Sequence, residues 1–93
     1  MKAAVKKVIG TVRGESNKAI YVKFSHHNPI ENCPDVHKEW VAKSQVSIIN
    51  DNEIVIPEWL FLTIQKRIIA GFNNYYNNGK NHINENDCYL YEI

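Results

Sequence analysis

Short runs in which apolar and polar residues alternate are the strongest constraint on the fold of this chain. Ile20, Val22 and Phe24 alternate with polar or amphipathic neighbours. A period of two places such residues on one face of a strand. The run over 5–13 alternates more loosely, and the turn-forming residues 14–17 separate the two runs. The pattern therefore predicts two antiparallel strands joined by a short turn.

The rest of the chain adds further short strands and one helix. Leu60, Ile64 and Ile68 recur at four-residue spacing, which predicts a helix over about residues 57–70 with Pro57 as its first residue and Gly71 as its end. More strands are predicted over 39–43, 46–49, 53–56 and 88–93. The fold class is then α+β, with a small curled antiparallel sheet or barrel-like fold of about five to six strands and one helix.

Length and composition indicate one domain over residues 1–93. The polar, proline-containing stretch 25–37 predicts a long exposed loop, and the asparagine-rich stretch 72–87 predicts another. Trp40, which lies between these two predicted loops in the sequence, is expected in the core.

Charge and cysteine content exclude several classes. Eleven Lys and Arg against ten Asp and Glu give a net charge of +1, which argues against a strongly basic nucleic-acid clamp and against an acidic DNA mimic. Two cysteines imply no disulfide framework. The charged N-terminal residues do not resemble a signal peptide, and no apolar run is long enough to span a membrane. A cytoplasmic location in a bacterial host cell is expected.

No arrangement of residues predicts catalysis, a metal or a cofactor. His26, His27, Cys33 and His37 lie close in sequence, but neither a Cys-x-x-Cys pair nor zinc-finger spacing is present. Cys33 is expected as an isolated loop thiol and Cys88 as a buried apolar residue. The glycines are too scattered to form a phosphate-binding loop. We therefore expect a protein that is not an enzyme.

Three spaced motifs carry a resemblance to a family. They are Lys18-Ala19-Ile20, the stretch from Trp40 to Val46, and Ile56-Pro57-Glu58-Trp59-Leu60. In this order they resemble the KAI, W-x-PKSQ and IPEWL motifs of small uncharacterised phage and prophage proteins. Ala42 replaces the proline usual before Lys43. The resemblance implies a phage origin and a β-rich fold, and it transfers no functional residue.

The first functional hypothesis is a phage or mobile-element protein that acts by binding. Such a protein would sterically inhibit a host protein, for example a defence nuclease complex, as anti-CRISPR proteins do. Tyrosines among asparagines are typical of adaptable interfaces. The expected partner-binding residues are Tyr75, Tyr76, Asn74, Asn77, His26 and His27. A homodimer that buries Trp59, Leu62 and Ile69 is an open alternative.

The second hypothesis is a single-stranded nucleic-acid-binding accessory protein that uses its sheet face. Exposed aromatic side chains stack on bases, and basic side chains contact phosphates. Tyr21, Lys23, Arg13 and Lys43 are the candidates for this role. A third class, a dimeric protein that sequesters a small nucleotide in a pocket, also stays open.

Overall fold

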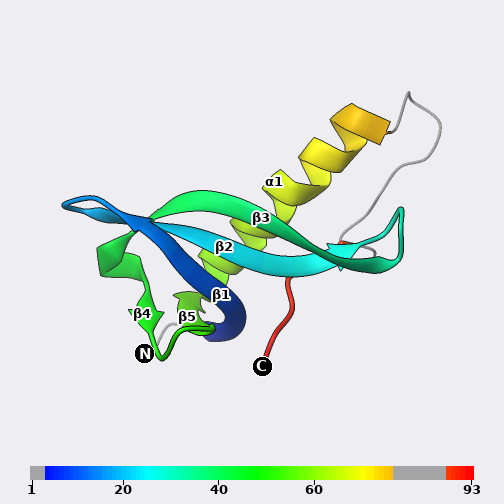
Figure 1. Ribbon diagram of the computed structural model, residues 1–93. Coiled ribbons are helices and arrows are strands. Elements are labelled where there is room, and N and C mark those ends of the chain that lie inside the picture. Colours follow the sequence, from blue (N-terminus) through cyan, green and yellow to red (C-terminus); the bar gives the residue numbers. More distant parts are fainter. Residues whose placement is uncertain (1–3, 77–87) are drawn as a thin grey trace.

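Five antiparallel strands form one open sheet, and an α-helix lies against one of its faces (Figure 1). The structure is a computed structural model that describes residues 4–76 and 88–93, with the backbone alone over 73–76. The strands follow the order β3-β2-β1-β5-β4 across the sheet. In chain order the elements are β1 (Val5–Glu15), β2 (Ala19–Asn28), β3 (Cys33–Ala42), the 3-10 turn η1 (Lys43–Gln45), β4 (Ser47–Ile48), β5 (Glu53–Pro57) and α1 (Glu58–Tyr76). The α+β class is confirmed, and the sheet does not close into a barrel.

β1 is shared between two halves of the sheet. Its first half pairs with β5, and its second half pairs with β2. Gly10 stands at the change of partner, where a Cβ atom would lie 3.1 Å from Ile54 Cδ1 and 3.2 Å from Val22 Cγ1. The close approach of these two core residues favours glycine here.

The residues 88–93, called the terminal segment below, fill the gap that opens where β1 leaves β2. The Tyr91 carbonyl accepts a hydrogen bond from the Ile9 amide (3.1 Å), and the Tyr91 amide donates to the Ser25 carbonyl (3.0 Å). The segment makes isolated bridges to β1 and β2 rather than a full strand. The predicted last strand is thus present only as this short insertion.

The core lies between the sheet and α1. The buried amide side chain of Gln65 takes part in it, because its Oε1 accepts a hydrogen bond from the Leu90 amide (3.0 Å) and so ties the helix to the terminal segment. Cys88 is fully buried, as expected. The buried apolar residues are Val8, Ile20, Val22, Phe24, Val41, Ile54, Ile56, Leu60, Phe61, Ile64, Ile68, Ile69, Cys88 and Leu90.

The prediction of a long exposed loop over 25–37 is wrong. β2 continues to Asn28, β3 begins at Cys33, and only residues 29–32 form the turn. The Asn28 carboxamide oxygen accepts hydrogen bonds from the Ile30 amide (2.9 Å) and the Glu31 amide (3.0 Å), and Asn32 adopts a φ of 53°. Asparagine thus closes a tight hairpin between strands made largely of polar residues.

The helix also differs from its predicted bounds. Pro57 ends β5 opposite Val5, and α1 begins one residue later, with the Glu58 amide donating to the Ala4 carbonyl (2.9 Å). The helix passes through Gly71 and ends at Tyr76, so the loop predicted over 72–87 is wrong for 72–76. The rest of that stretch, 77–87, lies outside the described residues.

Several large apolar side chains that the sequence placed in the core or in a dimer interface are exposed in the structure. Trp40, expected in the core, is 53% exposed because Glu39 and Val41, not Trp40, face the helix side of β3. Trp59 and Leu62 are exposed on α1, whereas Ile69 is buried in the core. No described helix is long and apolar enough to cross a bilayer.

Candidate nucleic-acid interface

No described element covers the sheet face opposite α1, which is called the open face below. Alternation along β2 buries Ile20, Val22 and Phe24 against the helix and turns the intervening residues outward. The residues that matter on the open face are Tyr21, Lys23 and His27 of β2, Lys38 and Trp40 of β3, and Tyr89 and Tyr91 of the terminal segment.

The first feature of the open face is an aromatic pair. Tyr21 and Trp40 are direct cross-strand partners, and their ring centroids lie 5.1 Å apart at an interplanar angle of 41°. Gly14 of β1 lies beside them, where a Cβ atom would come within 3.9 Å of Trp40 Cη2. The indole therefore extends over a bare stretch of backbone and keeps half of its surface in solvent.

The second feature is a pair of like charges. Lys23 and Lys38 are directly opposite in the β2–β3 register. Like charges in this position destabilise a sheet. Across residues 4–76 and 88–93, no carboxylate lies within ion-pair distance of either ammonium group, whereas Lys7 on the same sheet face pairs with Glu53 (3.5 Å). Two uncompensated cations thus stand side by side next to the aromatic pair.

The third feature is a second aromatic group, at the far end of β2. The His27 ring stacks on Tyr89 with centroids 5.2 Å apart and planes within 13°, and Tyr89 meets Tyr91 edge to face at 5.9 Å. The His27 amide donates to the Tyr89 carbonyl (2.8 Å), which holds the two residues in register. Burial, and then Tyr89, raise the pKa of Tyr91, so its hydroxyl stays protonated as a donor.

These features follow one another along β2. Tyr21 and His27 are six residues apart on the same strand face, which corresponds to roughly 20 Å. The lysine pair lies between them. The open face thus carries two aromatic groups with the pair of lysines between them.

The structure separates the four residues predicted for nucleic-acid binding. Tyr21 and Lys23 lie together on the open face, as predicted. Lys43 does not join them, because it follows β3 in η1 and forms an ion pair with Glu15. Arg13 is the extra residue of a β-bulge in β1 and has no direct partner in β2.

Of the six residues predicted for partner binding, the structure describes the side chains of His26 and His27 alone. His26 is 2% exposed, with Nδ1 3.0 Å from the His27 carbonyl oxygen and 3.9 Å from Cys88 Sγ. His27 lies on the open face, where its ring stacks on Tyr89. Asn74, Tyr75 and Tyr76 belong to the last turn of α1, where only the backbone is described, and Asn77 lies outside the described residues.

The remaining polar groups do not assemble a metal centre within the described part of the chain. His37 lies on the helix side of β3, where Nε2 is 2.7 Å from Glu39 Oε1 and Arg67 holds the same carboxylate. Burial, and then Arg67, lower the pKa of His37. Burial, and then the carboxylates of Glu31 and Asp35, raise the pKa of the Cys33 thiol, which keeps it protonated and a weak nucleophile.

The sequence-based prediction missed Lys38 and Trp40, and it assigned His27 to protein binding rather than to the open face. Burial alternates from residue 33 to residue 42 and pairs Trp40 with Tyr21 across the strands, but the residues that face the helix there, such as His37 and Glu39, are polar. The polar composition of 25–37 hid that alternation. Comparison with known proteins supplies no further assignment: no protein-family model, curated protein or solved structure matches this chain.

Proposed function

We propose that the protein binds single-stranded nucleic acid on its open face. The observation that carries the proposal is the uncompensated pair of Lys23 and Lys38 between two exposed aromatic groups. Base stacking on aromatic rings combined with phosphate contacts to basic side chains is the usual chemistry of sequence-tolerant single-strand binding.

The position of the lysine pair supports phosphate contact. Two facing ammonium groups cost stability in the free protein, and a bound phosphate relieves that cost by placing a negative charge between them. The net charge of +1 leaves the rest of the molecule close to neutral. Binding is therefore expected to depend on this local pair, and affinity to fall as salt concentration rises.

The aromatic pair supports base contact. Trp40 is 53% exposed and is braced on one side by Tyr21, so its free face is available for stacking without a change in the protein. His27, Tyr89 and Tyr91 form the second group. A nucleic-acid strand that runs along β2 would contact the Tyr21–Trp40 pair first, then the two lysines, and then the group around His27.

The first test uses tryptophan fluorescence. Trp59 lies on α1 and not on the open face, so the Trp59→Phe variant leaves Trp40 as the single reporter. Titration with oligo-dT or oligo-U at low salt is expected to quench Trp40, since a stacked base lies against the indole. The matched Trp40→Phe variant, which keeps Trp59, is expected to show no quenching.

Fluorescence anisotropy of the same labelled oligonucleotides gives the salt dependence. In single-strand binding, the logarithm of the association constant falls linearly with the logarithm of the salt concentration. The magnitude of this slope should decrease by about 0.7 for each lysine lost, so the double variant Lys23→Ala with Lys38→Ala should decrease it by about 1.4. Absence of binding at low salt, or equal quenching of the two single-tryptophan variants, would reject the proposal.

The alternative of a phage inhibitor of a host defence complex stays a prediction. It rests on the motif resemblance and on Asn74, Tyr75, Tyr76 and Asn77. The structure gives no side-chain description of these residues, and it buries His26. No contact in the described part of the chain favours this function over nucleic-acid binding.

A further inference from the structure

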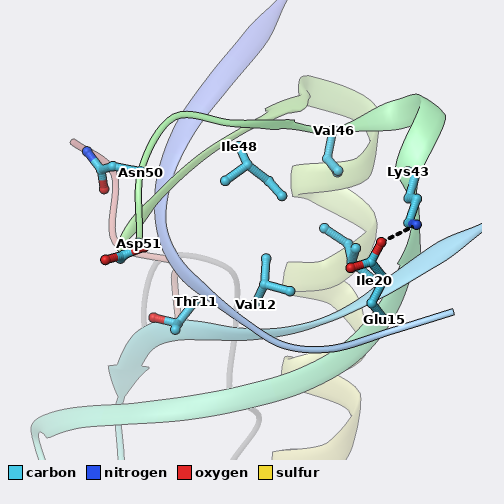
Figure 2. A pocket seen from close by; sticks show the side chains of 9 residues that line it. All are labelled: Thr11, Val12, Glu15, Ile20, Lys43, Val46, Ile48, Asn50 and Asp51. Atoms are coloured by element: carbon cyan, nitrogen blue, oxygen red, sulfur yellow. Dashed lines mark hydrogen bonds and ion pairs between the residues drawn. The ribbon is translucent and has the colours of Figure 1, made fainter.

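A second site lies away from the open face, at the end of the β1–β2 hairpin that α1 leaves uncovered. Here a cavity of about 530 Å³ opens between β1, β2 and the stretch from η1 to the turn after β4. Figure 2 shows its aliphatic side chains converging from both sides on the cavity. They are Val12, Ile20, Val46 and Ile48.

One wall of this cavity is a free strand edge. Pairing of β1 with β5 stops at Ile9, and the Gly10 amide makes the last bond on that side, to the Asn52 carbonyl (3.0 Å). Backbone groups two residues apart on a strand face the same way, so the amide and carbonyl of Val12 also point away from β2. They point to the cavity that Val12 lines, where the described strands provide no further partner.

Glu15, at the end of β1, also turns its backbone groups away from β2. The Ser16 amide donates across the hairpin to the Ala19 carbonyl (2.8 Å), so the backbone groups of the preceding Glu15 face the opposite side. Val12 and Glu15 are separated by roughly 10 Å of strand. Because the β-bulge at Arg13 lies between them, a short extended peptide pairs its own backbone with Val12, and Glu15 marks the end of this edge.

Charged groups lie at opposite ends of the cavity. Glu15 and Lys43 neutralise each other at one end, and Asp51 lies with Asn50 at the other (Figure 2). Asn50 is occupied, since its carboxamide donates to Glu53 (2.8 Å) and accepts from the Asn52 amide (2.8 Å). The Asp51 carboxylate has no partner in the part of the chain that the structure describes.

We propose that this cavity is a docking slot for an extended segment of a partner protein, which adds a short strand to the free edge of β1. The backbone edge supplies hydrogen bonds, and the aliphatic lining takes an apolar side chain. Asp51 selects an arginine or lysine at the end of the segment. The expected ligand is therefore an alternating apolar–polar peptide with a basic residue at one end, bound independently of nucleic acid.

The test uses an array of acetylated pentapeptides of defined pattern. Positions one and three are Thr, positions two and four are Val, Ile, Leu or Phe, and position five is Arg or Gln. The labelled protein is expected to prefer members that end in Arg. N-methylation of a backbone amide that pairs with β1 is expected to weaken the best member by about tenfold, the upper range for one lost hydrogen bond.

Matched variants locate the binding. Ile48 and Ile49 are 54% and 52% exposed, and only Ile48 lines the cavity. Ile48→Asp is expected to abolish peptide binding, whereas Ile49→Asp leaves it unchanged. Asp51→Asn removes the preference for Arg over Gln. Both isoleucine variants should keep the wild-type circular dichroism spectrum and the wild-type affinity for oligonucleotide.

Three results would overturn the proposal. The first is an array with no member above background. The second is equal loss of binding in Ile48→Asp and Ile49→Asp. The third is self-association of the free protein that Ile48→Asp abolishes in sedimentation equilibrium, which would assign the slot to a second copy of this chain.

Discussion

At the residue scale, Trp40 shows how a single side chain marks the open face. Tryptophan is on average a highly buried residue type, yet Trp40 has half of its surface in solvent and contacts Tyr21 across the strand. Keeping half of this ring exposed on a sheet face gives up about half of the stability that full burial would add. Under the proposed function, the exposed half of the ring is the surface on which a base stacks.

Replacing Trp40 separates binding from stability. Trp40→Ala is expected to weaken oligonucleotide binding by about 1–3 kcal/mol, the contribution of one stacked base. The free energy of unfolding should fall by about 1 kcal/mol, because the half-buried ring loses its cross-strand contact with Tyr21. Anisotropy titration and urea denaturation measure the two quantities. Trp59→Ala is the control. If it weakened binding as much as Trp40→Ala does, Trp40 would have no special role in binding.

The lysine pair gives a prediction in which stability and binding change in opposite directions. Lys38→Glu places a carboxylate opposite Lys23, so the fold is expected to gain about 0.2–1 kcal/mol in urea denaturation. The same change removes a phosphate contact, so affinity for oligonucleotide should fall. Lys66, exposed on α1, offers Lys66→Glu as a control that lies away from the open face. A variant that loses stability, or binds as tightly as wild type, would contradict the argument.

At the element scale, the β2–β3 hairpin and the terminal segment together make the platform. The hairpin places the aromatic pair and the lysine pair on one face. The terminal segment then enters the gap between β1 and β2 and brings Tyr89 and Tyr91 beside His27. Residues from both halves of the sequence thus meet on one surface, and the segment's position depends on its buried side chains.

The anchoring of the terminal segment can be tested at Leu90. Its side chain is 2% exposed, and its amide bonds to Gln65. Leu90→Ala is expected to cost about 2–5 kcal/mol of unfolding free energy, since it leaves a cavity under the sheet. Ile93→Ala should cost under about 0.5 kcal/mol, because that side chain is 55% exposed. Denaturation midpoints give both values, and equal costs would mean that the segment is not anchored through Leu90.

At the scale of the whole molecule, stability is expected to depend on pH through His37. Its pKa in the folded state lies below the ordinary value of 6.5, first because of burial and then because of Arg67. The unfolded chain therefore binds more protons in mildly acidic solution, and acidification favours unfolding. Stability from this group is complete above about pH 6.5 and is lost as pH falls toward the lower folded pKa.

The measurement is the melting temperature of wild type and His37→Gln between about pH 7.5 and pH 5. Glutamine keeps a donor for Glu39 but does not titrate. As the pH falls over this range, the melting temperature of the variant should decrease less than that of wild type. Curves that run parallel would show that His37 does not contribute to the acid sensitivity.

Periodicity along the sequence was sufficient to predict the local elements of this protein. Alternation in β1, β2 and β5 and the four-residue spacing of Leu60, Ile64 and Ile68 predicted strands and a helix, because side-chain periodicity follows directly from backbone geometry. It also placed Tyr21 and Lys23 on one outward face. It failed over 25–37, where polar side chains such as His26 and Asn28 are buried through hydrogen bonds that composition does not show.

Which side chains come into contact across the open face followed from strand register and core packing, and not from local pattern. The register of β3 against β2 puts Trp40 beside Tyr21 and Lys38 opposite Lys23, and a one-residue shift would have sent both to the helix side. The gap that accepts the terminal segment exists because β1 changes partner at Gly10. Contacts between distant parts of a chain depend on packing over the whole core, and local periodicity carries no information about them.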